Sequence, residues 1–419
     1  MVEKRLTGKS RPVTATFMRR SIAGIAALSL ALLSCLCQPA AAASDDKSHG
    51  ADSLGHLLDV FNPYASLTLT NDSNIYRLDD QQPSIGDRGD QFTTLAVGFD
   101  SNIKSGLQQY LLSGEYSPTR YNNHTDINYD GAKAAAIWHW TATDLLAGTA
   151  GYRYSQSLRN FANQLAPKRI IDLRTENHFF AGADYDLPEN WKVGARGDFA
   201  DVNFNHTSGL DIQRTSGGAN LDYISRAGNT LGFDAQYTHG NYKNSPVEDF
   251  NEYTIGPTVE WKFTVRTQLK GNLGYTERSY TNNSRKPAYG NVTGRFTLTI
   301  ADAGRGSLSA AMWRELSNLG DEIAEYTIIN GLSLDPAWTL SNGLTARVHG
   351  SYEHRDFKVV SGVEGDRIDD VGNISGFLDW PIGRHFKLSG GVTVERRSST
   401  RYLQSYSDLQ QQLQIVGTL

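Results

Sequence analysis

Between residues 89 and 419 the chain repeats one unit: about ten residues that alternate between two faces, a short turn, about ten more, and a longer polar loop. In residues 91–100, for example, Leu95, Val97 and Phe99 share one face. Alternation of this length, with short and long connections in turn, is typical of a transmembrane β-barrel. A soluble sandwich also alternates, but its strands usually run to only about five or six residues.

Read strand by strand, the alternation predicts an all-β, antiparallel, up-and-down transmembrane barrel with eighteen strands. Sixteen strands remain an alternative, since the pattern is blurred in the first and the thirteenth. Pro257 cannot donate a ladder hydrogen bond, so we expect a bulge there. The predicted strands are residues 64–71, 91–100, 110–116, 134–140, 146–154, 179–187, 191–198, 219–223, 231–237, 253–263, 269–275, 292–298, 308–312, 326–334, 344–352, 374–380, 386–394 and 409–415.

The connections between these strands fall into two length classes, apart from a short link at residues 317–321 on the long side. Short turns of outer-membrane barrels face the periplasm and long loops face outward, so both termini are expected inside. Six of the seven tryptophans lie in or beside the short turns, where an indole suits the membrane boundary. The predicted periplasmic aromatic girdle consists of Trp138, Trp140, Trp191, Trp261, Trp338 and Trp380.

Charged residues occupy the face of each strand opposite the apolar one. A lysine or arginine facing lipid near the midplane costs about 2–4 kcal/mol, so this face is expected to line a lumen. A barrel of this size can hold an aqueous channel. The charges either hydrate and brace the wall or bind a polar polymer in transit. The lumen-lining candidates are Lys133, His139, Arg153, Lys192, Arg196, Asp198, Asp234, Glu260, Lys262, Lys270, Arg347, His349, Glu353, Lys387 and Glu395.

The first 43 residues have the pattern of a secretory signal peptide, with Arg19-Arg20, an apolar run at residues 22–33 and an Ala-rich cleavage site ending at Ala43. Met18 is an alternative start, and Cys35 an alternative lipoprotein acylation site. Residues 44–60 are then a polar periplasmic segment and residues 61–419 the barrel.

The expected mature chain contains neither cysteine and is acidic. Of 40 basic and 45 acidic residues, 34 and 44 remain after residue 43, a formal net charge of −10. Nothing in this balance favours nucleic-acid binding. No later stretch has the roughly eighteen apolar residues of a membrane-spanning helix.

Signatures of catalysis are missing: no phosphate loop, zinc-protease or serine-hydrolase motif occurs. His139 and His349 could act as bases, but spacing assigns them no nucleophile, so we interpret them as structural. Residues 364–370 (E-G-D-R-I-D-D) could hold a cation, yet they lack the spacing of a calcium loop, which favours solvated acids. We therefore predict no enzyme activity, cofactor or metal.

Several segments resemble the EpsL-type outer-membrane barrels of exopolysaccharide operons. They are residues 61–64 (F-N-P-Y), 72–78 (D-S-N-I-Y-R-L), 175–177 (T-E-N), 313–317 (W-R-E-L-S) and 352–357 (Y-E-H-R-D-F). The resemblance implies a barrel that helps polysaccharide cross the outer membrane and has no catalytic residues. One departure is the final residue, Leu419, where such barrels usually end in an aromatic residue read by the assembly machinery.

Three functions follow, in this order: exopolysaccharide export, uptake of sugars or other solutes as a diffusion porin, and, distantly, outer-membrane hydrolysis. The expected location is the outer membrane of a Gram-negative bacterium. The expected partners are outer-membrane lipid and lipopolysaccharide, a transported polysaccharide, the barrel assembly machinery and periplasmic export proteins.

Overall fold

The computed structural model describes residues 60–79, 81, 88–164, 170–282, 288–302, 304–317, 324–340, 343–359 and 367–418. The expected signal peptide, nearly all of the expected periplasmic segment and Leu419 lie outside these residues. None of the helices among them is long and apolar enough to cross a membrane. The strands are β1 (Pro63–Asp72), β2 (Asp90–Ser105), β3 (Gln108–Tyr121), β4 (Tyr129–Thr141), β5 (Leu146–Leu158), β6 (Leu173–Asp186), β7 (Trp191–Phe204), β8 (Ile212–Ile224), β9 (Thr230–Tyr242), β10 (Phe250–Lys262), β11 (Thr267–Tyr280), β12 (Tyr289–Asp302), β13 (Gly306–Ser317), β14 (Tyr326–Thr339), β15 (Thr345–Lys358), β16 (Arg367–Ile382), β17 (Phe386–Ser399) and β18 (Tyr406–Thr418).

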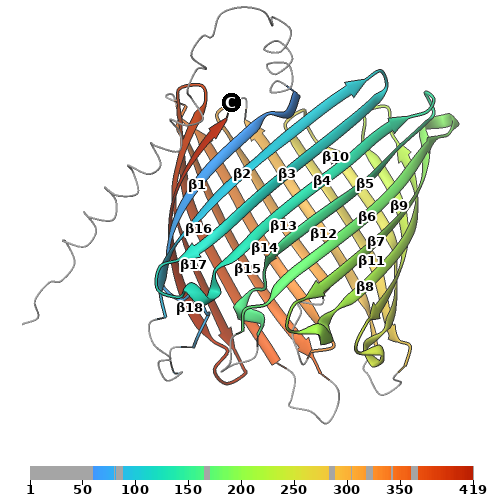
Figure 1. Ribbon diagram of the computed structural model, residues 1–419. Helices are drawn as coiled ribbons and strands as arrows, with labels where there is room; N and C mark the ends of the chain where they lie inside the picture. Colours follow the sequence, from blue (N-terminus) through green and yellow to red (C-terminus); the bar gives the residue numbers. More distant parts are fainter. Residues whose placement is uncertain are drawn as a thin grey trace, which may run out of the picture. The chain divides into compact units, whose positions relative to one another are not determined.

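The strands form one closed antiparallel sheet (Figure 1). Each strand pairs with its neighbour in the sequence, and β1 closes the sheet by pairing with β18, from Tyr64 opposite Thr418 to Asp72 opposite Gln410. The predicted antiparallel barrel of eighteen strands is therefore confirmed, and the alternative of sixteen is not. Closure leaves no strand of the sheet without a neighbour on either side.

The two faces of the wall differ as the alternation predicts. On β16, Ile374, Leu378 and Trp380 are more than half exposed, whereas the intervening Ser375 and Asp379 are buried. Large apolar side chains recur on the exposed face of the other strands as well. We take this face as the outer surface of the barrel and the polar face as the inner one.

Short turns gather at one end of the barrel and longer links at the other (Figure 1). The turn between β2 and β3 has only two residues, and its Gly106 has a φ of +58°, which favours glycine. One expectation about the links was wrong: β13 ends at Ser317 and β14 begins only at Tyr326, so the link between them is not short. At the long-loop end the strands continue for several residues beyond the part in which apolar and polar residues alternate.

Three of the long links are built alike. Each contains a 3₁₀ turn, η1 (Thr125–Ile127), η4 (Ser208–Leu210) or η5 (Pro246–Glu248). The last residue of the preceding strand donates its backbone N–H, at 2.7 Å, to the side chain of the residue seven positions later. The pairs are Tyr121 with Asn128, Phe204 with Asp211, and Tyr242 with Asp249. This side-chain acceptor substitutes for the backbone partner that the N–H loses where the strand ends.

Pro257 causes no bulge, contrary to expectation. Pairing of β10 with β11 breaks off after Ile255–Tyr275 and resumes in the same register at Thr258–Asn272. Pairing with β9 continues through Pro257 itself. The register is therefore kept although Pro257 lacks a donor, because the neighbouring pairs on both sides of Pro257 are kept.

Two further 3₁₀ helices, η2 (Phe161–Asn163) and η3 (Pro188–Asn190), lie in other links.

Candidate functional site in the barrel lumen

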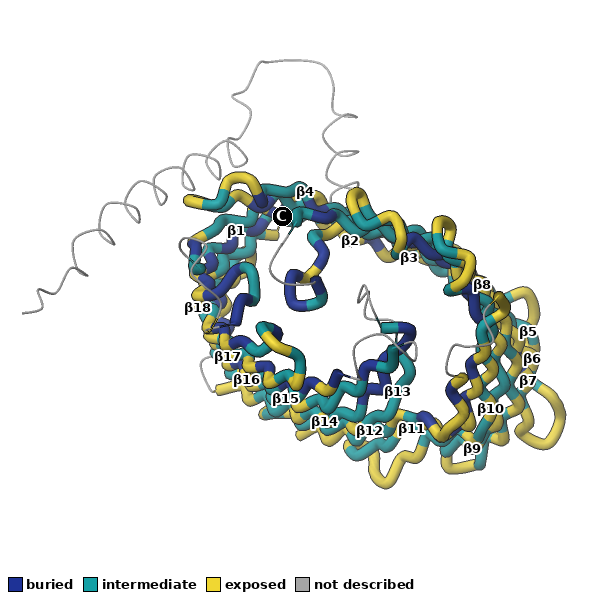
Figure 2. The backbone as a smooth tube through the Cα atoms, turned by 90° about the horizontal axis from the view of Figure 1, so that it is seen from below, coloured by how far each residue is buried: buried dark blue, intermediate teal, exposed yellow. Residues whose placement is uncertain are grey.

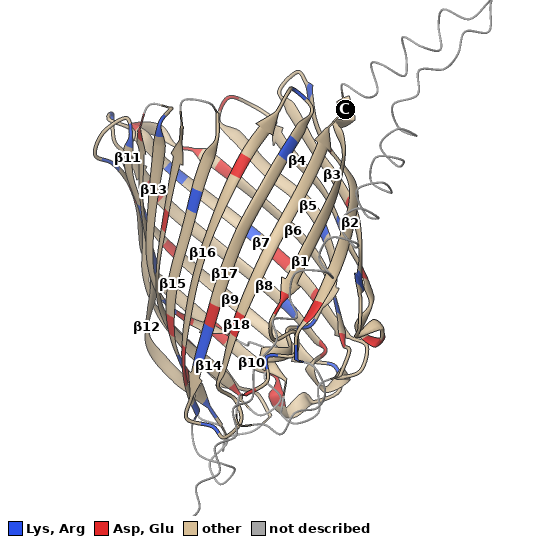
Figure 3. Cartoon of the chain, turned by 90° about the vertical axis from the view of Figure 1, so that its left-hand side faces the viewer, with Lys and Arg blue, Asp and Glu red and all other residues tan. Residues whose placement is uncertain are grey.

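Most of the predicted lumen residues lie on the inner face and pair with charged side chains of the same strand or of a strand one or two positions away. The arginines make the closest pairs: Arg196 donates two hydrogen bonds to Asp234, at 2.6 and 2.8 Å, and Arg347 donates two to Asp379. Basic and acidic positions are both scattered along the strands (Figure 3), so no single sign dominates the field. The other pairs are Lys133–Glu115 (3.8 Å), Lys192–Asp186 (3.3 Å), Lys270–Glu260 (3.1 Å), His349–Asp335 (2.5 Å) and Glu353–Arg355 (2.6 Å).

The remaining candidates have other surroundings. The guanidinium of Arg153 lies 4.4 Å from the centre of the Phe180 ring, and Nδ1 of His139 lies 2.9 Å from the Thr149 hydroxyl. Glu395 accepts a hydrogen bond from Tyr406. Lys262 and Lys387 form no ion pair with any described residue. Asp198 lines an internal cavity, described below.

Three long links pack against one another at the long-loop end. Ile75, Ile127 and Phe161 come from the links after β1, β3 and β5, and they form a buried apolar cluster. Tyr76 stacks edge-on against Phe161, with ring centres 5.2 Å apart. Burial, together with the carboxylates of Asp126 and Asp90, raises the pKa of Tyr76 to about 12. Buried segments lie inside the ring of strands when the barrel is seen from this end (Figure 2).

The link after β5 is tied to the distant strand β17. Arg397 of β17 donates a hydrogen bond of 2.5 Å to the backbone carbonyl of Ala162. Five strands separate β5 from β17 in the closed sheet, so this link reaches across part of the opening. We call residues 159–164 with Arg397 the lumen bridge. It narrows the long-loop end of the barrel.

Buried carboxylates hold both ends of the lumen bridge. Asp369 of β16 pairs with Arg397 at 2.6 Å and also with Arg367, and all three side chains are buried. At the other end, Arg159 lies 3.6 Å from Asp172, which also accepts the backbone N–H of His206. A buried carboxylate that pairs with arginine and accepts further hydrogen bonds offsets its cost of desolvation.

A second set of charges joins β1 to β18 beside the lumen bridge. Arg77 pairs with Asp72 at 3.2 Å and with Asp408 at 3.0 Å. The two carboxylates of Asp72 and Asp408 hold the pKa of Arg77 above its ordinary value, against the opposing effect of burial. Arg77 therefore remains charged and connects β1 to β18, the first and last strands of the closed sheet.

Behind the bridge lies a cavity of about 640 Å³ whose charged lining the sequence interpretation largely missed. Its residues sit on the long-loop ends of strands, beyond the stretches where apolar alternation was clear. There the outward side chains are polar too, so period two is no longer visible as hydrophobicity. Arg174 pairs with Glu176, and Arg278 with Glu252, each at 2.6 Å. Arg214 forms no ion pair within the described part of the chain. The charged lining residues are Arg159, Arg174, Glu176, Asp198, Arg214, Glu252 and Arg278.

The two described aspartates of the acidic segment at residues 364–370 differ: Asp369 departs from the expected solvated acid, whereas the Asp370 side chain is 45% exposed. Asp369 is fully buried among arginines, and Asp370 accepts hydrogen bonds from Tyr352 and His354. Residues 364–366 lie outside the described residues. Within the described ranges no group of three or more His, Cys, Asp or Glu side chains could hold a metal ion.

The histidines offered as bases have simple partners. His349 lies against Asp335, and His139 against Thr149. Neither contact includes both a nucleophile and an orienting carboxylate, which a hydrolase of the serine type requires.

Aromatic side chains ring the outer face at both ends. The six tryptophans all lie near the short turns, and five of them are exposed. The long-loop end carries a tyrosine ring that the sequence interpretation missed. Its hydroxyls reach polar neighbours, as in Tyr237 to Asn251 at 2.8 Å. Members of this tyrosine ring are Tyr116, Tyr152, Tyr154, Tyr237, Tyr253, Tyr275 and Tyr352. Two aromatic rings of this kind flank the apolar band of membrane barrels.

No family model and no curated protein matches this sequence. Solved structures of β-barrels can be superposed on most of the chain. OpdL of Pseudomonas aeruginosa is 12% identical, with 86% of this chain and 98% of that chain covered and a TM-score of 0.44. OccAB3 of Acinetobacter baumannii is 9% identical, with 86% and 99% covered and a TM-score of 0.47. The outer membrane protein OpdK of P. aeruginosa is 11% identical, with 85% and 98% covered and a TM-score of 0.44. The likeness concerns the barrel fold and identifies no solute.

Proposed function

We propose that the protein is an outer-membrane pore through which small polar solutes diffuse, most simply for uptake. The closed barrel, the exposed apolar band and the two aromatic rings support placement in the outer membrane. The charged inner wall supports a water-filled path, since paired ions of both signs remain hydrated at low cost. This function requires neither a catalytic group nor a cofactor.

The observation that favours small solutes over a polymer is the lumen bridge. A branched or folded polysaccharide, which is wider than a single sugar, would have to displace the bridge from the opening. Displacement would separate Arg397 from Ala162 and expose the buried Arg397–Asp369 pair. A buried donor that loses its acceptor costs about 1–3 kcal/mol. Small solutes can pass beside the bridge without that cost.

Exopolysaccharide export is the second candidate function. The EpsL-type resemblance of the segments at residues 61–64 and 72–78 favours it, and so do the mixed charges of the wall, which suit scattered sugar hydroxyls. In this alternative, polysaccharide is the transported ligand and periplasmic export proteins are partners. The link after β5 would then have to move during transport.

The test is conduction by the purified, refolded protein. Planar bilayers should show stable single-channel currents, and vesicle swelling should show entry of monosaccharides but slower entry of longer oligosaccharides. Arg397→Met removes the hydrogen bond to Ala162 and should raise both the conductance and the size limit. Arg196→Met, on the wall away from the bridge, is the matched control and should leave the size limit unchanged.

Absence of conductance in the folded wild-type barrel would overturn the diffusion proposal. If Arg397→Met alone conducted, the bridge would be a closed plug, and export with an accessory opening step would become the better explanation. Deletion of the gene then separates the two functions in cells, because export predicts loss of surface polymer and diffusion predicts slower growth on a limiting solute.

A further inference from the structure

The barrel wall has a seam at its long-loop end, between β12 and β13. Pairing of these strands runs from Asp302–Gly306 to Gly294–Arg314 and stops there. Yet β12 begins five residues earlier, at Tyr289, and β13 continues to Ser317. Those extensions pair only with β11 and β14, respectively. The two strands therefore diverge, and backbone groups along the seam lose their ladder partners.

Arg314 lies in this seam on the outer face of the barrel. It shares a face with Met312, which is 62% exposed. Its Nε donates to the carbonyl of Val292 at 3.2 Å, and its Nη1 donates to the Asn330 side chain at 2.7 Å. The guanidinium thus satisfies one orphaned carbonyl, and two neutral groups accept its hydrogen bonds.

Arg314 differs from Arg120 and Lys243, two other outward-facing basic residues at this end, in the kind of group that it contacts. Arg120 pairs with Asp130 at 2.6 Å, and Lys243 pairs with Asp201 at 2.5 Å. Arg314 has no carboxylate partner among the described residues. An arginine on the membrane side of the wall without a carboxylate is suited to an anion supplied from outside the chain.

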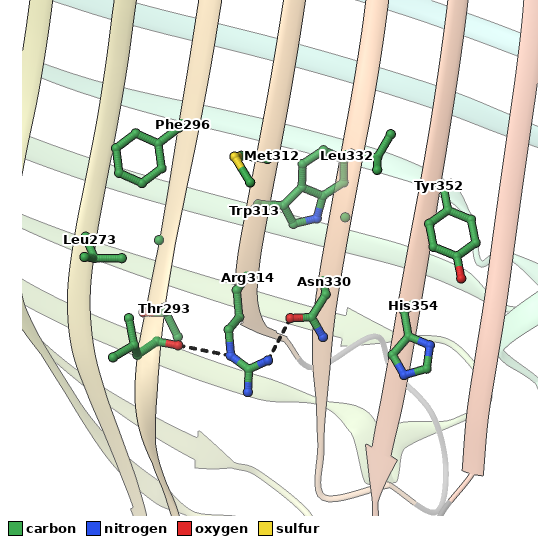
Figure 4. A pocket seen from close by; sticks show the side chains of 13 residues that line it. Leu273, Thr293, Phe296, Met312, Trp313, Arg314, Asn330, Leu332, Tyr352 and His354 are labelled. Atoms are coloured by element: carbon green, nitrogen blue, oxygen red, sulfur yellow. Dashed lines mark hydrogen bonds between the residues drawn. The ribbon is translucent and has the colours of Figure 1, made fainter.

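A groove of about 430 Å³ opens beside Arg314 on the outer face. In Figure 4, Phe296, Met312, Leu332 and Tyr352 form an apolar row, and Thr293, Arg314, Asn330 and His354 form a second row nearer the long-loop end. A cationic group at the end of an apolar groove matches a molecule with an anionic head and a hydrocarbon chain. Only constituents of the membrane have direct access to this face.

We propose that the groove binds a phosphorylated, acylated lipid of the outer leaflet, the lipid A part of lipopolysaccharide. Arg314 binds a phosphate, and one acyl chain lies along Met312, Leu332 and Phe296. This inference rests on the proposed outer-membrane location with the long loops outward. The carboxylate of Asp370 lies beside the groove. It accepts hydrogen bonds from Tyr352 and His354, and these reduce its repulsion of a phosphate.

Binding of such a lipid uses both the polar row and the apolar row of the groove. A phosphate can accept two parallel N–H groups from one guanidinium, which a neutral headgroup cannot do with equal strength. Each methylene of an acyl chain that leaves water or disordered lipid for a fitted groove adds contact with its lining. The Tyr352 ring is apolar on its faces and polar at its hydroxyl, which suits the boundary between the two parts of the lipid.

The experiment measures lipid retained by the purified full-length barrel in detergent, by native mass spectrometry, with bisphosphorylated lipid A as the probe. Wild type should retain one lipid A molecule at this site, and Arg314→Gln should lower its apparent affinity about tenfold, the loss expected for one charge-assisted contact. Arg120→Gln is the matched control on the same face and should bind as wild type does. Met312→Gln should weaken binding through the acyl chain.

Equal lipid A retention by wild type and Arg314→Gln would overturn the proposal. So would displacement of lipid A by inorganic phosphate at millimolar concentration, because the apolar row would then contribute nothing. Single-channel conductance of the same samples separates this proposal from the pore: normal conductance without lipid binding overturns only the lipid site, and lipid binding without conductance overturns only the pore.

Discussion

The inner wall near the short turns and the inner wall near the long loops use the same residue types in different surroundings. Toward the short turns, Lys270 is 60% exposed beside Glu260, and Arg347 is 51% exposed beside Asp379. At the long-loop end, Arg397 and Asp369 are both fully buried, and Arg159 with Asp172 is almost so.

The difference in burial decides what each pair can do. Exposed pairs in high dielectric contribute about 0–1 kcal/mol, so they keep the wall polar and leave it tolerant of change. Buried pairs are sensitive to the loss of one partner, so they hold a link in a fixed place. The end near the short turns therefore provides a hydrated wall, and the long-loop end provides a fixed constriction. Four measurements test this contrast, beginning with the largest expected effect.

Asp369→Ala removes the carboxylate shared by Arg367 and Arg397. Two buried guanidinium groups lose it together, so the barrel should be destabilised by about 3–5 kcal/mol. Denaturant unfolding of the refolded protein in vesicles measures this. Asp234→Ala, which removes the partner of the half-exposed Arg196, should cost far less; equal losses for the two variants would remove the contrast between the ends.

Val392→Arg tests the apolar band of the outer face. Val392 lies midway along β17 and is exposed on the outer side. Arginine at the bilayer midplane should cost about 2–4 kcal/mol, measured as loss of heat-modifiable folded barrel. Leu388→Arg is the control, since Leu388 pairs with Trp380 near the short turns, where arginine costs only about 0–1 kcal/mol. Normal assembly of Val392→Arg would reverse the assignment of faces.

Asp249→Ala tests whether hydrogen bonds of the long links that are not part of an ion pair also matter. It removes the acceptor for the N–H of Tyr242 at the end of β9. A buried donor without a partner costs about 1–3 kcal/mol, so the link should open to limited trypsin cleavage after Lys243. Asp249→Asn keeps an acceptor oxygen and should remain resistant. Cleavage of both variants at the same rate would show that the charge, and not the hydrogen bond, protects the link.

Arg196→Ala should have the smallest effect on stability, at most about 1 kcal/mol, because its side chain is 40% exposed. The substitution should instead change conduction. Removal of a positive charge from the lumen should shift the ion selectivity toward cations, which is measured as a change in reversal potential across a salt gradient. A stability loss as large as that of Asp369→Ala would mean that the wall near the short turns is as tightly constrained as the constriction.

The sequence alone determined the architecture. Period-two alternation places every second side chain on one face, so Leu378, Trp380 and Val392 could be assigned outward without coordinates. Short and long connections, read in turn, predicted the strand number, because an up-and-down barrel pairs each strand with the next. Ion pairs such as Arg196–Asp234 could not be predicted individually, since register between strands depends on the closed sheet.

The constriction and the seam were decided only by tertiary structure. Arg397 and Ala162 are 235 residues apart, and neither belongs to a motif that points to the other. Their contact exists because closure of the sheet brings β17 opposite the link that follows β5. The seam has the same origin: β12 and β13 each alternate normally, and only their divergence leaves Arg314 beside an unpaired carbonyl. A local pattern records which face a residue occupies, but contacts across a barrel depend on where the closed sheet places distant strands.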